Sequence, residues 1–244
     1  MATVFFEVLK TMGAQKTQEL KDFLKFTRWN LNFEFESPSH QHIVPLHKPQ
    51  LVMIGCSGIH VSSGKASHPI LGCSISRYFC FPTVLRDLTT YPKNELDKVC
   101  SETAREWETE GSVLILLDDE NNVVDFVKVK SWWYILLRCI REKIRRIKGP
   151  ESVPMTCSAV INRIQTLTRS MKIGEEYSKC FIGVGTLFVE WLGYMNPDGS
   201  MPRMVDAIDS YPTRWLEFLS DKGFPGDQGL LQAVSGSNSE ENEK

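Results

Sequence analysis

Long apolar runs and strong net charge are both missing from this sequence. No apolar segment approaches the roughly eighteen residues that a membrane helix needs, and the first six residues carry no basic segment ahead of a short apolar one. We therefore expect a soluble chain with no membrane partner. The formal net charge of −2 conceals a small basic excess in residues 1–148 and an acidic excess in residues 149–244.

A regular spacing of cysteines is missing as well. The seven cysteines are odd in number, and no Cys-x-x-Cys pair occurs. A disulfide framework would need an even and patterned set, so this usage indicates reduced thiols in a cytoplasmic or nuclear compartment.

The apolar residues that are present suffice for a sizeable core. With 244 residues, of which 42% are hydrophobic, we expect one domain and a smaller second one. Composition and apolar period change near Pro150, so the sequence predicts a first domain at residues 1–150 and a helical region at residues 151–234. Residues 235–244 are rich in Ser, Asn and Glu and are predicted to form a disordered tail.

Two apolar runs around an acidic turn predict a β-hairpin. Residues 113–117 and 123–129 flank Asp118-Asp-Glu-Asn-Asn122, which is too polar to continue either strand. We therefore expect the chain to fold back about Glu120.

This hairpin would bring charges of both signs together. Folding about Glu120 places Glu110 opposite Lys130, and alternation puts Lys128 on the same face. Such a face suits a polyanion and its metal, because lysine binds phosphate as a compact charge and a carboxylate oxygen is a hard ligand for Mg²⁺. The alternative is a solvated face with cross-strand ion pairs, each worth about 0.2–1 kcal/mol.

A second predicted strand carries another acidic candidate. Residues 29–36, Trp-Asn-Leu-Asn-Phe-Glu-Phe-Glu, alternate between apolar and polar side chains before Pro38 ends the strand. Glu34 lies in this strand among aromatic neighbours. The alternative interpretation of Glu34 is an edge-strand carboxylate that faces water.

These segments together resemble a known family. Phe33-Glu34-Phe35, then Glu110-Gly111, then Lys128-Val-Lys-Ser-Trp-Trp-Tyr134 follow the order of nucleotidyltransferase motifs III, IV and V. In this order they look like the phage-type, tRNA-repair-like ATP-dependent RNA ligases. The resemblance covers roughly residues 15–140 and says much less about the remainder.

The resemblance implies an α+β fold: a truncated antiparallel nucleotidyltransferase domain of the ATP-grasp-like ligase type, followed by a small helical region. In that family the motif III acid contacts the adenosine ribose, the motif IV acid helps to hold the metal, and the motif V lysines contact nucleotide phosphates. It thus implies nucleotide contacts for Glu34, Lys128 and Lys130 and a metal contact for Glu110. The implied cofactors are ATP and Mg²⁺, and the implied partners are the 5′-phosphate and 3′-hydroxyl ends of RNA.

The family's nucleophile is a motif I lysine in a Lys-x-x-Gly setting, which attacks ATP and forms a lysyl-adenylate. Lys10-Thr-Met-Gly13 has this spacing. Residues 14–26 after it have the apolar period of a helix, however, whereas the family has a strand there. We therefore expect Lys10 to be no nucleophile, and the chain to be inactive by itself.

A basic amphipathic helix is predicted at residues 132–148, directly after motif V. Its arginines could follow an RNA backbone, and those on or beside the polar face are Arg138, Arg141, Arg145 and Arg146. Three alternatives stay open: a surface helix whose arginine stems pack along apolar surface, a membrane-surface segment, and a target of a calmodulin-type receptor.

The C-terminal part is predicted to be helical. Residues 155–171 and 177–192 have helical period, residues 195–200 form a turn, and residues 204–219 hold one helix or two broken at Pro212. Two interpretations of the whole chain remain beside an inactive ligase-like domain. It is a product or part of a longer active ligase, or it is a non-catalytic module that binds RNA or protein.

Overall fold

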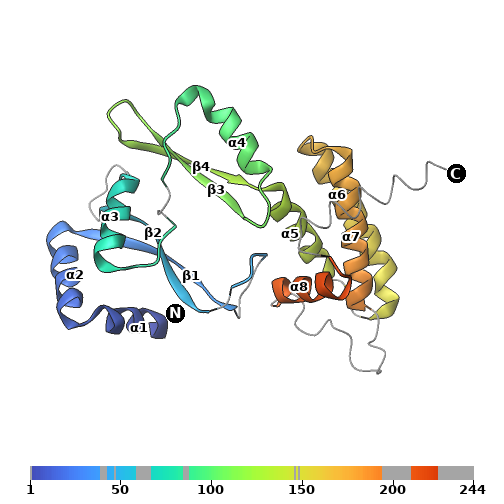
Figure 1. Cartoon of the computed structure of the whole chain (residues 1–244), viewed down its shortest axis with the longest axis horizontal. Coiled ribbons are helices and arrows are strands. Elements are labelled where there is room, and N and C mark those ends of the chain that lie inside the picture. The colour runs from blue at the N-terminus through green and yellow to red at the C-terminus, as the bar shows by residue number, and fades with distance from the viewer. Residues whose placement is uncertain are drawn as a thin grey trace. The chain divides into compact units, whose positions relative to one another are not determined.

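The structure is a computed structural model that describes residues 2–38, 43–46, 48–58, 67–84, 88–145, 147, 149–193 and 210–224. Its helices and strands are shown in Figure 1. Contacts divide the chain into two compact units. Unit 1 comprises residues 1–38, 46–100 and 112–129, and unit 2 comprises residues 39–45, 101–111 and 130–244.

Unit 1 begins with two helices, α1 (Ala2–Met12) and α2 (Ala14–Thr27), which are separated by Gly13. Gly13 has a φ of 85°, which glycine adopts without steric cost, so the chain changes direction there (Figure 1). The predicted helix after Gly13 is confirmed. Its inward side chains are Leu20, which is buried, and Phe23 and Leu24, which pack against the same core.

Strand β1 (Trp29–Glu36) has the bounds that its alternation predicts. It pairs antiparallel with β2 (Gln50–Gly58), and a bulge between Asn32 and Phe33 shifts the register. Its polar residues up to Glu34 are exposed, whereas the alternate apolar residues are partly buried. Those that pack against the core of unit 1 are Trp29, Leu31 and Phe33.

Helix α3 (Pro69–Phe79) packs against β2, and it is followed by the short 3-10 helix η2 (Lys93–Glu95) and α4 (Leu96–Ala104). The fully or nearly buried side chains of this core are Leu20, Met53, Cys56, Ile75, Phe79 and Phe81.

Strands β3 (Gly111–Leu117) and β4 (Val123–Lys130) form the predicted hairpin. At its turn the Asp118 amide donates to the Asn122 carbonyl over 3.0 Å, so the chain folds back about Glu120 as predicted.

The strands of the described residues form two separate two-stranded sheets, β1 with β2 and β3 with β4. This confirms a mixture of helices and small antiparallel sheets, which is the α+β class. The nucleotidyltransferase fold itself stays a prediction. The hairpin exposes several large apolar side chains, namely Val113, Leu117, Val124 and Phe126.

Where the structure describes it, unit 2 contains α5 (Trp132–Ile144), α6 (Val153–Ser170), α7 (Glu175–Gly193) and α8 (Tyr211–Asp221), with a 3-10 turn, η3 (Pro150–Ser152), before α6. They share one core. The apolar stripe predicted for the helix after motif V is buried in it: Trp133, Leu136, Leu137, Ile140, Ile144 and Ile147.

Helix α5 belongs with the C-terminal helices. The sequence predicts a domain limit at residue 150, whereas the contacts divide the chain at residue 130. The physical reason is the apolar stripe of α5, which packs against α6 and α7.

The two predicted helices after residue 151 are confirmed as α6 and α7, with slightly wider bounds. Pro212 does not interrupt α8. It lies in the first turn of α8, where the missing amide hydrogen removes no helical hydrogen bond. The predicted turn at residues 195–200 and the predicted tail at residues 235–244 lie outside the described residues, as do residues 204–209.

No helix in the part of the chain that the structure describes is long and apolar enough to cross a membrane. All seven cysteines are free thiols. Burial raises the pKa of Cys139 and of Cys180 to about 11, so these two thiols stay protonated at neutral pH. The cytoplasmic or nuclear compartment stays a prediction.

A methyl group on Gly193 should destabilise unit 2. A Cβ at this position, in the last turn of α7, would overlap the Cγ2 methyl of Val153 on α6. Because valine has few alternative rotamers, we expect Gly193→Ala to lower the free energy of unfolding by about 1–3 kcal/mol in urea melts. Gly183→Ala is the control. Its Cβ meets open space in the same helix, so it should raise stability by about 0.5–1 kcal/mol, and equal losses in both variants would contradict this packing.

Candidate functional site

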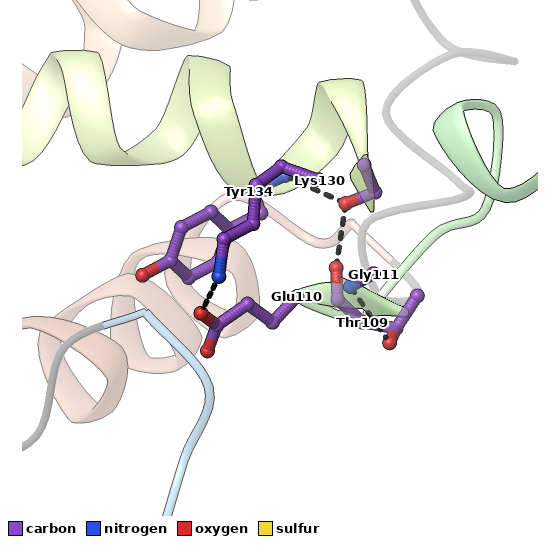
Figure 2. Close-up of polar contacts among 6 residues, drawn as sticks. Thr109, Glu110, Gly111, Lys130 and Tyr134 are labelled. Carbon is purple, nitrogen blue, oxygen red and sulfur yellow. Dashed lines mark hydrogen bonds and ion pairs between the residues drawn. The ribbon is translucent and has the colours of Figure 1, made fainter. Parts of the chain in front are cut away.

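The start of α5 is fixed by the side chain of Ser131. Its Oγ accepts a hydrogen bond from the Tyr134 amide over 3.1 Å, which caps the helix, and donates one to the Thr109 carbonyl over 2.5 Å. The Ser131 amide also donates to the Glu110 carbonyl over 3.1 Å. Since Ser131 is completely buried, these bonds tie the first turn of α5 to the segment around Glu110 (Figure 2).

Glu110 and Lys130 meet as an ion pair between Oε1 and Nζ (Figure 2). The predicted approach of these two side chains is confirmed, although the nearest backbone bond joins Glu110 to Ser131, one residue beyond the predicted partner. The side chains keep 49% and 35% of their surface exposed. A pair so open to water is worth about 0.2–1 kcal/mol, so another anion can displace the carboxylate at small cost.

Lys130 also lies over the ring of Tyr134, with Nζ 5.1 Å from the ring centroid, which is a cation–π geometry. Tyr134 is buried. Burial raises the pKa of Tyr134, and the negative charge of Glu110 raises it further. Three nearby cations lower the pKa: Lys130, Arg138 and Arg141.

The predicted RNA-binding arginines of α5 lie in different environments. Arg138 is exposed and has no ion pair within the described residues. Arg145 is exposed and pairs with Glu142 over 3.2 Å. Arg146 lies outside the described residues.

Arg141 is buried, whereas the sequence places it with the other arginines on or beside the polar face. Only 8% of its side chain is exposed, and its Nη1 lies 3.1 Å from Glu142 Oε1. The reason is its position one helical turn after Leu137, at the border of the buried stripe. Its Nε is buried and has no hydrogen-bond partner among the described residues.

Two predicted nucleotide contacts belong to unit 1. Lys128 is exposed on β4, and Glu34 is exposed on the polar face of β1. The exposure of Glu34 also fits the alternative of a carboxylate that faces water. The roles of both residues stay predictions.

Lys10 lies in the last turn of helix α1 and is exposed. A lysine nucleophile needs a lowered pKa, which burial or cationic neighbours supply, and a rigid position near the phosphate. A helix end open to water supplies no burial. Lys10 therefore lacks both the strand of motif I and this means of activation.

A Mg²⁺ ion needs several hard oxygen ligands. Within the described residues no group of three His, Cys, Asp or Glu side chains gathers, and the Glu110 carboxylate already holds the Lys130 ammonium. The metal contact of Glu110 therefore stays a prediction.

Comparison with protein-family models and with curated proteins found no match to this chain. The interpretation of the site therefore depends on its own residues and geometry.

Two residues of this site carried no predicted role, Ser131 and Tyr134. A serine directly before a helical pattern is a signal for an N-cap, and it could have identified Ser131. Tyr134 follows Lys130 by four residues, but the two meet only because the helix starts between them. Sequence periodicity alone carries no signal for that contact.

Replacing Ser131 by alanine should loosen the start of α5. The change removes the cap and leaves the Thr109 carbonyl without its donor, so we expect a loss of about 1–3 kcal/mol in the free energy of unfolding, measured in urea. The control is Ser158→Ala on α6, an exposed serine that bonds only within its helix, with a change within about 0.5 kcal/mol. Equal stability of the two variants would show that Ser131 does not hold the site.

Proposed function

We propose that this chain binds the phosphate groups of RNA ends through Lys130 and the arginines of α5, and that by itself it forms no lysyl-adenylate. The observation that carries the proposal is the meeting of Glu110 and Lys130, which are 20 residues apart in the chain. The sequence predicts this pairing from the fold-back of the hairpin about Glu120, and the resemblance to the ligases implies a metal contact for Glu110 and a phosphate contact for Lys130.

The charges of α5 support the RNA part of the proposal. Exposed Arg138 lies on α5, which begins two residues after Lys130, and exposed Arg145 is the C-cap residue of the same helix. Basic side chains along one element bind a nucleic-acid backbone by releasing counterions. ATP and Mg²⁺ enter the proposal only through the resemblance to the ligases, because phosphate binding by Lys130 needs neither.

A second candidate function is a protein-binding module derived from the same fold. The apolar residues exposed on the hairpin favour it, with Val124 60% and Val113 53% exposed. Polar substitution of Val124 should weaken binding to a protein partner and leave RNA binding unchanged. Weaker RNA binding with unchanged binding to a protein partner would instead favour the RNA function.

The purified chain should not become labelled when it is incubated with Mg²⁺ and radiolabelled ATP and then separated under denaturing conditions. Attack on the α-phosphate needs a positioned and deprotonated amine, and Lys10 is exposed at a helix end. A labelled band that disappears in Lys10→Ala but persists in the control Lys21→Ala, an exposed lysine of α2, would contradict the proposal.

Single-stranded RNA should bind with little sequence preference. Its affinity should fall as salt rises, and Lys130 should contribute to that salt dependence. Each neutralised phosphate adds roughly 0.7 to the slope of log affinity against log salt, so the three or four accessible cations predict a slope of about −2 to −3. Lys130→Gln should reduce that slope by about 0.7 in anisotropy titrations. Lys93→Gln, at an exposed lysine of η2, is the control and should leave it unchanged. Binding that does not depend on salt would remove the nucleic-acid function.

A further inference from the structure

One stripe of α5 gathers more positive charge than its neighbours neutralise. Tyr134, Arg138, Arg141 and Arg145 follow one another at intervals of four, three and four residues, so they share one side of the helix beside the buried stripe. Lys130 joins them through its contact with the Tyr134 ring. Figure 2 shows this end of the stripe, with the Lys130 ammonium between the ring and Glu110.

Arg141 is an unusual member of this stripe because it is buried and incompletely paired. A guanidinium has five N–H donors. Glu142 takes one of them through Nη1, whereas Nε is buried without a partner in the described part of the chain. Buried donors are almost always paired, so the unpaired Nε of Arg141 needs an explanation, and an acceptor oxygen of a bound anion would supply one.

Tyr134 supplies a further donor. No hydrogen bond contributes to the pKa of its hydroxyl, whose surroundings include the charges of Lys130, Arg138 and Arg141. The first turn of α5 adds the positive end of the helix dipole close to Lys130. Phenol, ammonium and guanidinium groups are all donors to a phosphate.

From these contacts we infer a site for one phosphate monoester, formed by Lys130, Tyr134, Arg138 and Arg141. When no phosphate is bound, the Glu110 carboxylate forms an ion pair with Lys130 in its place. The inference rests on the proposed function, and it adds the residues that surround the phosphate and an internal competitor. A phosphate monoester carries about −1.5 to −2 charges at pH 7 and three acceptor oxygens, so it should replace a single half-exposed carboxylate.

The two possible roles of Glu110 predict opposite effects of one substitution. If Glu110 held a metal for the phosphate, as the ligase resemblance implies, Glu110→Gln would weaken binding in Mg²⁺. If Glu110 competes with the phosphate, the same variant binds more tightly and does so without any metal. Glu106→Gln is the matched control, since Glu106 is an exposed acid four residues earlier with no ion pair in the described residues.

The test measures binding of the full chain to a short oligoribonucleotide with a 5′-phosphate and to the same strand with a 5′-hydroxyl, in EDTA and in Mg²⁺, by anisotropy. We expect a preference of about fivefold for the phosphorylated strand. Glu110→Gln should raise the affinity for the phosphorylated strand about threefold in EDTA, and Glu106→Gln should not change it. Competition by AMP assigns the site to any phosphate monoester, and failure of AMP to compete assigns it to the RNA end.

Two further variants examine the residues around the phosphate. Tyr134→Phe removes only the hydroxyl, and Arg138→Gln removes an exposed charge, so thermal melts should show both variants folded. Each should reduce the preference for the 5′-phosphate about fivefold, whereas Arg169→Gln, an exposed arginine of α6, should keep it.

Weaker binding by Glu110→Gln, or a preference for phosphate unchanged by Tyr134→Phe and Arg138→Gln, overturns the inference. RNA binding that still depends on salt and on Lys130 would then leave the proposed function in place. Loss of all RNA binding in the wild type would overturn the proposed function. In that case a direct titration with AMP decides the inference separately. If Glu110→Gln binds AMP more tightly than the wild type does, the site is upheld. If neither protein binds AMP, the inference is overturned.

Discussion

The burial of one stripe of α5 determines where Tyr134, Arg138 and Arg141 lie on the surface of that helix. Leu136 and Ile140 have no exposed surface, and turning the helix to expose either would cost about 1.5–3 kcal/mol per side chain. The rotation of the helix is therefore set by packing against α6 and α7. Tyr134 and Arg141 lie at the edge of this stripe because of that rotation, partly inside the core and beside the charged surface.

The contacts at the start of α5 differ in what they contribute. The Glu110–Lys130 ion pair is half exposed, so its net contribution is too small to position either residue. The bonds of Ser131 are buried, and each is worth more because an unpaired buried group costs about 1–3 kcal/mol. Ser131 therefore holds Lys130 and the chain around Glu110 together, and the ion pair follows from that arrangement. Because the Glu110–Lys130 ion pair is weak and the Ser131 bonds are strong, a bound anion can replace the Glu110 carboxylate without disturbing the position of Lys130.

Local patterns in the sequence predicted the features that local physics determines. Strict alternation gives the bounds of β1, and the polar turn fixes the fold-back at Glu120, from which the meeting of Glu110 with Lys130 follows. The features that depend on packing between distant elements carry little signal in the sequence. The contacts group α5 with helices that come later in the chain, from residue 130 on, because its apolar stripe packs on α6 and α7. The helical pattern places Arg141 on or beside the polar face, but it does not show that this side chain is buried at the border of the apolar stripe.

The balance of charge along the stripe formed by Tyr134, Arg138, Arg141 and Arg145, with Lys130, argues for an anion of a particular charge. Glu142 gives one oxygen to Arg141 and the other to Arg145, so a single carboxylate serves two guanidinium groups. Glu110 serves Lys130, and Arg138 has no acid of its own in the described residues. If all six side chains are ionised, four cations face two carboxylates, which leaves an excess of two positive charges. A chloride ion or a second carboxylate would neutralise half of this excess, whereas a phosphate monoester near pH 7 carries close to two negative charges and neutralises nearly all of it. The terminal phosphate of an RNA end or a nucleotide meets this condition, while an internal phosphodiester, with its single charge, meets only half of it.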